Sequence, residues 1–220
     1  MQGAAEHTII AIDGPAASGK SSVAHELARR LGFVYVNSGA MYRAITWLVL
    51  ERGIAPDDGK AIENLAETVP LVCSLRDRDS IILLDGTDPE PFLRQNRVND
   101  NVSLVSSVPR VREIIVEHLR RYAETNDLVM EGRDIGSVVF PDTPYKFYID
   151  ASPEIRLRRR EAQGQQDRVT ARDEADSSRH ASPLTIAEDA HVIDSSNLTI
   201  DGVVGEIIGR LKRKGLTVAT

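Results

Sequence analysis

The stretch that decides the fold reads Gly14-Pro15-Ala16-Ala17-Ser18-Gly19-Lys20-Ser21, which fits the pattern G-x-x-x-x-G-K-[ST]. It follows a β-branched run, Thr8 to Asp13, and precedes apolar residues that recur at helical spacing, at Val23, Leu27 and Leu31. This order predicts a buried strand, a glycine loop and a helix. Such a loop turns its N–H groups inward at the positive end of a helix, where they can bind a phosphate.

This loop, called the P-loop below, predicts a nucleotide site. Lys20 should reach the outer phosphates, and the Ser21 hydroxyl can ligate Mg²⁺. We predict that ATP contacts Gly14, Pro15, Ala16, Ala17, Ser18, Gly19, Lys20, Ser21 and Ser22. The Asn-Lys-x-Asp guanine reader expected of Ras-type GTPases does not occur in the chain, and large motor ATPases usually need a longer chain. The pattern therefore favours a compact kinase that holds an acceptor against the last phosphate of ATP.

Further apolar runs predict the other strands of an α/β fold. They are Phe33 to Val36, Leu128 to Met130, Lys146 to Ile149 and Ala190 to Ile193. Helical patterns lie between them, notably from about Ala40 to Glu51 and from about Val203 to Leu211. Because strands alternate with helices, we predict a parallel sheet covered on both faces.

One section, between about residues 69 and 97, breaks this alternation. An apolar run is followed by the polar turn Arg76 to Asp79, a second apolar run from Ile81 to Leu84, and the turn dipeptide Asp85-Gly86. This pattern is typical of a small antiparallel hairpin, which we interpret as an insertion. A long amphipathic helix follows it, with apolar residues at Val111, Ile114, Ile115, Leu119 and Tyr122.

Composition places the chain among globular proteins. Its 220 residues are 41% hydrophobic, which suits one domain with a sizeable core. No apolar run approaches the roughly 18 residues of a membrane span, and the first residues lack the basic start and apolar stretch of a signal peptide. We therefore expect a cytoplasmic protein without a membrane partner. A net charge of −6 argues against a nucleic-acid partner, whose binding face would be basic.

The single cysteine and the histidines predict no metal centre or disulfide. Cys73 has no second cysteine to pair with, so we expect a small buried apolar residue and not a nucleophile. The five histidines show no paired ligand spacing. From Arg156 to Arg179 the chain is almost devoid of large apolar residues, and we expect a mobile surface element there.

Two polar clusters follow strands at the predicted ligand-binding edge. Asn37-Ser38-Gly39-Ala40-Met41-Tyr42-Arg43 follows the second strand, and Glu131-Gly132-Arg133-Asp134 follows the third. Open α/β sheets bind ligands at the carboxyl ends of their strands. Taken alone, Ser38 could simply cap the next helix and Arg43 could be solvated. Two such clusters at the same edge as a P-loop favour an acceptor site.

At these residues the sequence resembles bacterial cytidylate kinase, and the resemblance runs through nearly the whole chain. Its motifs are Ile12-Asp13-Gly14-Pro15 with the P-loop, the cluster from Asn37 to Arg43, Val108-Pro109-Arg110-Val111-Arg112-Glu113, the segment from Glu131 to Asp142, and the segment from Arg172 to Arg179. The resemblance implies a P-loop three-layer fold with a parallel five-stranded core, in one domain of residues 1–220. It also implies a monophosphate-binding insert at about 67–97, a short lid at about 156–172, and a core formed by about 1–66 and 98–220.

The resemblance also implies an activity and a set of site residues. The activity is ATP- and Mg²⁺-dependent phosphorylation of CMP and dCMP by a monomer. Cytosine would be surrounded by Ser38, Ser103, Arg112 and Asp134, and the acceptor phosphate held by Arg43 and Arg133. Arg172 and Asp176 would approach the ribose and phosphate, with Arg179 near the transferring group. The catalytic residues would be Lys20, Arg133, Arg172 and Arg179.

Chemistry makes these roles sensible. Cytosine offers an amino donor and ring acceptors, which suit the Asp134 carboxylate and the Arg112 guanidinium, whereas uracil would set an oxygen against Asp134. No general base is needed, because the acceptor phosphate is already an anion. Mg²⁺, Lys20 and converging arginines must offset the repulsion between the two substrates. Lid arginines from Arg156, Arg158, Arg159 and Arg160 would complete the site on closure.

Several alternatives stay open at this stage. Arg112 could be a solvated residue of its amphipathic helix, and Asp176 and Arg179 could be solvated on a polar segment. Between Arg160 and Arg172 the chain is shorter than the lid segment common in the family, and Arg168 has no assigned role. The acceptor could also be UMP, dCMP alone or a non-nucleotide such as shikimate. A non-catalytic nucleotide-binding module is the competing class.

Overall fold

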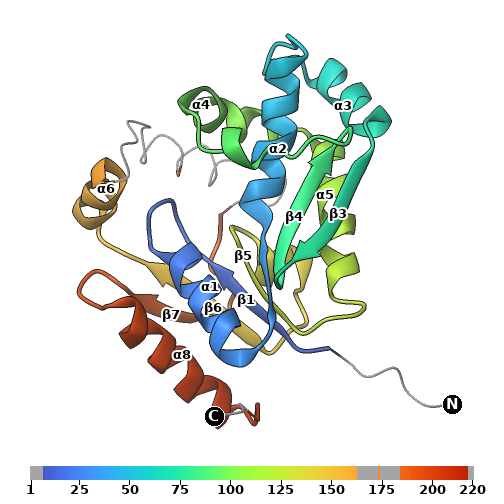
Figure 1. The fold of residues 1–220 in the computed structure, drawn as a ribbon. Helices are drawn as coiled ribbons and strands as arrows, with labels where there is room; N and C mark the ends of the chain where they lie inside the picture. The colour runs from blue at the N-terminus through green and yellow to red at the C-terminus, as the bar shows by residue number, and fades with distance from the viewer. Residues whose placement is uncertain (1–6, 163–172, 174–183, 218–220) are drawn as a thin grey trace, which may run out of the picture.

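A computed structural model of the chain describes residues 7–162, 173 and 184–217, and Figure 1 shows its fold. Within these residues seven strands form one sheet in the order β3-β4-β2-β5-β1-β6-β7. Their bounds are Ile9–Asp13 (β1), Val34–Asn37 (β2), Leu71–Arg76 (β3), Asp79–Leu84 (β4), Leu128–Gly132 (β5), Tyr145–Asp150 (β6) and His191–Asp194 (β7). Strands β2, β5, β1, β6 and β7 pair in parallel. The predicted five-stranded parallel core is thus confirmed.

The predicted hairpin is also present, but it is part of the sheet. Strands β3 and β4 pair antiparallel over six residue pairs. Asp77 and Arg78 in the turn have φ angles of 50° and 69°, and two positive φ angles are what a tight two-residue hairpin turn requires. The pairing of Tyr35 with Asp79 then joins β4 to the outer edge of β2. The hairpin thereby covers an edge that would otherwise expose unpaired backbone groups, and extends the sheet from five strands to seven.

Helices cover both faces of the sheet (Figure 1). Within the described residues they are Lys20–Leu31 (α1), Ser38–Glu51 (α2), Gly59–Thr68 (α3), Asn96–Val105 (α4), Pro109–Tyr122 (α5), Pro153–Ala162 (α6) and Ile200–Arg213 (α8), with short helical turns at Glu90–Phe92 (η1) and Ile135–Val139 (η2). In β1, Ala11 packs with α2 to α5, while Ile10 and Ile12 pack with α1 and α8. Alternate residues of one strand therefore feed two separate cores, as the strand period of two requires.

Capping side chains set the first residues of two helices, both of which begin earlier than the sequence pattern predicted. The Asn37 side chain accepts a hydrogen bond from the Ala40 N–H at 3.0 Å, so α2 begins at Ser38. The Thr199 hydroxyl accepts one from the Gly202 N–H at 3.1 Å, so α8 begins at Ile200. Both caps satisfy N–H groups that have no partner inside the helix.

The segment that the sequence predicted as a mobile surface element begins inside α6, which runs to Ala162. Beyond that helix, only Asp173 of this segment belongs to the part of the chain that the structure describes. Cys73 is half-buried against the core, and burial raises the pKa of its thiol to about 11, which keeps it protonated and unreactive. Among the described helices, none has the length and apolarity to cross a bilayer.

Candidate active site

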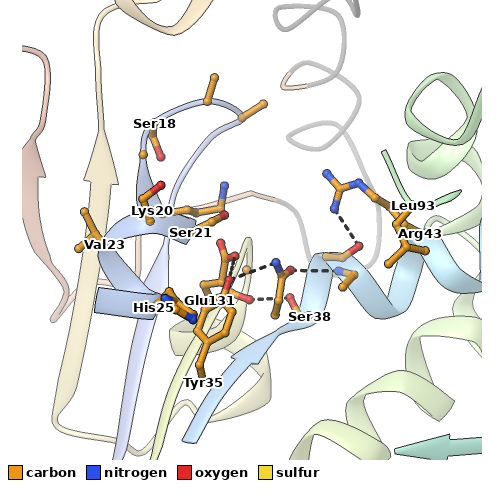
Figure 2. A pocket seen from close by; sticks show the side chains of 18 of the residues that line it. Ser18, Lys20, Ser21, Val23, His25, Tyr35, Ser38, Arg43, Leu93 and Glu131 are labelled. Carbon is orange, nitrogen blue, oxygen red and sulfur yellow. Dashed lines mark hydrogen bonds between the residues drawn. The ribbon is translucent and has the colours of Figure 1, made fainter. Parts of the chain in front are cut away.

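A cleft of about 1480 Å³ opens at the carboxyl ends of β1, β2 and β5. Its walls come from the P-loop, the start of α2, the segment after β5, and parts of α4 and α6. Figure 2 shows Lys20, Ser21, Ser38, Arg43 and Glu131 around this space. Pockets for one small ligand are usually about 300–1,000 Å³. The cleft is therefore larger than a pocket for one small ligand, and it has room for two such ligands.

The P-loop has the backbone that the motif predicts. Gly14 and Gly19 have φ angles of 152° and 89°, in the region that favours glycine. A Cβ atom on Gly14 would lie 2.1 Å from the Ile149 carbonyl oxygen, so no larger residue fits there. The helix α1 begins at Lys20, whose buried ammonium group donates to the Pro15 carbonyl at 3.0 Å. Ser21 and Ser22 are exposed and line the cleft.

A carboxylate that the sequence reading left without a role faces the same cleft. Glu131 is the next-to-last residue of β5 and pairs with Ile12 of β1; it is 2% exposed and lines the cleft. Its Oε1 accepts a hydrogen bond from the Tyr35 hydroxyl at 2.8 Å, and burial raises the pKa of Tyr35 well above its ordinary value. Tyr35 therefore stays a donor. The only sequence signal for Glu131 was its place at the end of a buried strand.

Ser38, expected beside cytosine, and Arg43, expected at the acceptor phosphate, both lie on α2. Ser38 is buried and donates to the Glu131 carbonyl at 2.8 Å. Arg43 donates to the Gly39 carbonyl at 2.9 Å and to the Asn99 side chain at 3.3 Å. The cap of α2 is Asn37 and not Ser38, and both Ser38 and Arg43 line the cleft.

Arg133 connects the two sides of the cleft. Its Nη1 donates to the Gly14 carbonyl at 2.8 Å, which joins the segment after β5 to the start of the P-loop. The neighbouring Gly132 could not carry a side chain, because a Cβ atom there would lie 2.5 Å from the Ser38 hydroxyl. The backbone at Gly132 therefore packs closely against Ser38, while Arg133 holds the same segment against the start of the P-loop. These two contacts limit the positions that the Arg133 side chain can reach.

Arg112 and Asp134 form a buried ion pair at the far end of the cleft. They are 4% and 3% exposed, and the Arg112 Nη2 donates to the Asp134 Oδ2. The guanidinium also donates to the Ser106 carbonyl at 3.3 Å and lies 5.2 Å from the centre of the Tyr42 ring. Within the described residues its Nε has no acceptor. Arg112 thus lies on the buried face of α5, and the alternative of a solvated arginine is wrong.

Asp13, for which the sequence motif indicated no role, holds the segment that carries Asp134. Its two carboxylate oxygens accept the N–H groups of Ile135 and Gly136, each at 2.8 Å. Burial raises the pKa of Asp13 from 3.8 to about 7, an effect that these two bonds and the nearby Lys20 charge oppose and the Asp134 charge assists. One carboxylate thus joins the residue before the P-loop to the residues after Asp134.

This raised pKa predicts a pH-dependent stability. Because the folded pKa of about 7 lies above the ordinary 3.8, the folded protein binds more protons than the unfolded chain between these values. The free energy of unfolding should therefore fall as pH rises through this window, by up to about 4 kcal/mol from Asp13. In an Asp13→Asn variant this contribution should vanish, since an amide does not titrate. Melting temperatures at about pH 5 and about pH 8 test this; equal changes in both proteins would contradict it.

The remaining predicted residues fall into three groups. Ser103, on α4, lines the cleft. Arg172, Asp176 and Arg179 lie outside the described residues, as does Arg168. Of the four arginines of α6, Arg158 is exposed, Arg159 and Arg160 line the cleft, and Arg156 and Arg159 contact the backbone of the P-loop.

Comparisons with known proteins agree with this site. A family profile described as "Cytidylate kinase" matches residues 10–213. A cytidylate kinase from Limosilactobacillus reuteri (strain DSM 20016) is 41% identical over 216 residues, which cover 93% of this chain and 95% of that one. A cytidylate kinase from Corynebacterium efficiens is 44% identical over 212 residues, or 91% and 92% of the two chains. Both alignments span nearly the full length of each partner.

Among solved structures, the crystal structure of TT1252 from Thermus thermophilus has a TM-score of 0.50 and 19% sequence identity. It covers 96% of this chain and 100% of that chain. At this identity the likeness concerns the fold alone, which it supports over 96% of this chain.

Proposed function

Because the chain belongs to the cytidylate kinase family, and is therefore a nucleoside-monophosphate kinase that phosphorylates a nucleotide, we propose that it transfers the γ-phosphoryl group of Mg-ATP to CMP and dCMP. One observation carries this proposal: the P-loop and the buried Arg112–Asp134 pair line one cleft, with Arg43 and Arg133 also in its wall. The cleft would thus hold the donor, the acceptor phosphate and the base in one continuous space.

The donor end would bind ATP through the P-loop. The inward N–H groups and Lys20 would hold the β- and γ-phosphates. The Ser21 hydroxyl and the Glu131 carboxylate are oxygen ligands of the kind that Mg²⁺ prefers, and both line the cleft. These two residues suit Mg²⁺, and the bound ion would neutralise negative charge on the phosphate groups. Lys20 would follow the γ-phosphoryl group as it moves.

The acceptor end would bind the monophosphate through arginines. Arg43 and Arg133 can offset the two negative charges of the acceptor phosphate, and the bond from Arg133 to the Gly14 carbonyl fixes this arginine beside the donor site. An anionic oxygen of the acceptor can then attack in line without a general base. The protein's task is to align two anions and to keep water out.

The base would be read by the buried pair. The Asp134 carboxylate can accept the exocyclic amino group of cytosine, and Arg112 can donate to its ring acceptors. Ser38 and Ser103 would complete the polar wall. We further propose that the insert at about 67–97 helps to bind the monophosphate, that Arg172 and Asp176 approach its ribose and phosphate with Arg179 near the transferring group, and that the chain works as a monomer.

The direct test is ADP release by the purified protein with Mg-ATP and one acceptor at a time. CMP and dCMP should each support turnover, while UMP, AMP and GMP should support little. Turnover with UMP equal to that with CMP would reject the base assignment. Turnover with shikimate alone would reject a nucleotide acceptor, and ATP binding without acceptor-dependent turnover would favour a binding module.

A second prediction concerns Glu131. A Glu131→Gln variant keeps the shape and an acceptor for Tyr35 but removes the charge that faces the cleft. We expect activity at limiting Mg²⁺ to fall about 10- to 100-fold, with partial recovery at high Mg²⁺. Tyr35→Phe is the matched control, because it removes the 2.8 Å hydrogen bond and leaves the carboxylate. A Glu131→Gln enzyme with an unchanged Mg²⁺ dependence would show that this carboxylate does not serve the ion.

A further inference from the structure

Carbonyl groups of the P-loop accept hydrogen bonds from four cationic side chains, three of which also line the cleft. Four consecutive or nearly consecutive carbonyl oxygens each accept a hydrogen bond from a different cation: Gly14 from Arg133 at 2.8 Å, Pro15 from Lys20 at 3.0 Å, Ala16 from Arg156 at 3.3 Å, and Ser18 from Arg159 at 3.0 Å. Arg156 and Arg159 are three residues apart on α6, so they project from one face of this helix.

Arg159 is held firmly against the loop. Its Nη1 also donates to the Ser195 hydroxyl at 3.0 Å, and its Nη2 donates to the Ser195 carbonyl at 2.8 Å. The Ser195 hydroxyl in turn donates to the Ser18 carbonyl at 2.7 Å, so this oxygen accepts two hydrogen bonds. A Cβ atom on Gly19 would lie 3.4 Å from the Arg159 Nη1. The guanidinium thus packs directly on the loop backbone.

Arg156 holds the peptide carbonyl of Ala16 in a similar way. Besides the Ala16 carbonyl, it donates to the Ala151 carbonyl at 3.2 Å and pairs with the Asp173 carboxylate. The other oxygen of Asp173 accepts the Ala16 N–H at 3.0 Å. Ala16 is therefore held at its N–H by a carboxylate and at its carbonyl by the arginine that pairs with that carboxylate.

Peptide planarity connects these contacts to phosphate binding. The carbonyl of one residue and the N–H of the next share a plane and point in opposite directions. A donor that holds the Ser18 carbonyl therefore fixes the Gly19 N–H on the opposite side of that peptide, and the same holds for the Ala16 carbonyl and the Ala17 N–H. The binding power of a P-loop comes from N–H groups that converge on one anion.

We infer that Arg159, with Arg156, is a positioning residue of the phosphate loop: it fixes the inward amide groups that bind the donor phosphates and does not touch the transferred phosphoryl group. This inference rests on the proposed function, because it assumes that the loop binds ATP. It gives two of the four α6 arginines a task different from direct contact with the transferring phosphate.

The test compares Arg159→Gln with Arg213→Gln in the full chain. Arg213 is exposed at the end of α8, so the control removes the same charge without touching the loop. Calorimetry measures the binding of ATP, inorganic tripolyphosphate and CMP. We expect Arg159→Gln to weaken ATP and tripolyphosphate by a similar factor of about tenfold or more. CMP affinity and kcat at saturating ATP should stay within about threefold, and Arg159→Lys should recover part of the loss.

Other results would overturn the inference. Unchanged affinity for both phosphate ligands with a lower kcat would mean that Arg159 contacts the transferred group. Weaker ATP with unchanged tripolyphosphate would mean that it contacts the base or ribose. Equal effects of Arg213→Gln would mean a general charge effect.

Two further arms keep these results distinct from misfolding and from failure of the proposed function. If melting shows that Arg159→Gln is unfolded, Ser195→Ala carries the test, because it removes one bond to the Ser18 carbonyl without changing charge. We expect this variant to weaken both phosphate ligands by about threefold, and no change would reject the inference. A wild-type protein that binds neither ATP nor tripolyphosphate would reject the proposed function itself.

Discussion

Replacing Lys20 with alanine should lower kcat for CMP phosphorylation by about 10²- to 10³-fold, since this is the usual loss when one charged or polar group that stabilises a transition state is removed. Lys20 is 8% exposed, and its bond to the Pro15 carbonyl fixes it over the P-loop before any ligand arrives. Its charge would therefore meet the γ-phosphoryl group without first having to be ordered. The affinity for ATP should fall much less than kcat, because the loop amides remain.

Lys60 offers a matched control for this variant. Its side chain is 74% exposed on α3 and pairs only at the surface with Glu63 among the described contacts. Lys60→Ala should leave kcat unchanged, and both variants should unfold in a single transition by thermal melting. A Lys20→Ala enzyme that keeps more than a tenth of the wild-type kcat would show that another group supplies the transition-state charge.

Local patterns explain why much of the fold could be predicted. The P-loop is a short motif whose backbone is set by its own glycines, and its flanking strand and helix are set by neighbouring apolar residues. The same holds for the strands β1, β2, β5, β6 and β7 and for the turn at Asp77 and Arg78. The hairpin joins the sheet instead through the pairing of Tyr35 with Asp79, two residues that are far apart in the chain. No local pattern encodes such a pairing.

The site shows the same division. Ser38, Arg43, Arg133 and Asp134 could be placed at one sheet edge because each follows a predicted strand. The burial of Arg112 could not be read, since a helix face is fixed only by what packs against it. Asp13 meets partners more than 120 residues away, and Arg159 meets the loop from 141 residues away. Their side chains are ordinary in sequence, and only the folded chain gives them a role.

The second large effect is expected at Asp134, where stability and recognition must be separated. Removal of one partner of a buried ion pair typically costs about 3–5 kcal/mol, and Asp134→Ala would leave the 4% exposed Arg112 without its counterion. Loss of turnover in that variant could therefore reflect unfolding. A double variant, Arg112→Met with Asp134→Leu, removes both charges and should recover most of the stability, yet it should still fail to phosphorylate CMP.

Asp134→Asn gives the sharper measurement, because it alters the pattern of donors and acceptors at nearly constant shape. Cytosine presents an amino donor where uracil presents an oxygen, and an asparagine amide can donate to that oxygen where a carboxylate cannot. We expect the ratio of kcat/KM for CMP to kcat/KM for UMP to fall at least about 10- to 100-fold, as one good base contact discriminates by about 1–3 kcal/mol. Both substrates are measured on the same enzyme, so any loss of folded protein cancels from the ratio. A ratio equal to that of the wild type would remove Asp134 from base recognition and leave the buried pair as a structural feature of the cleft wall.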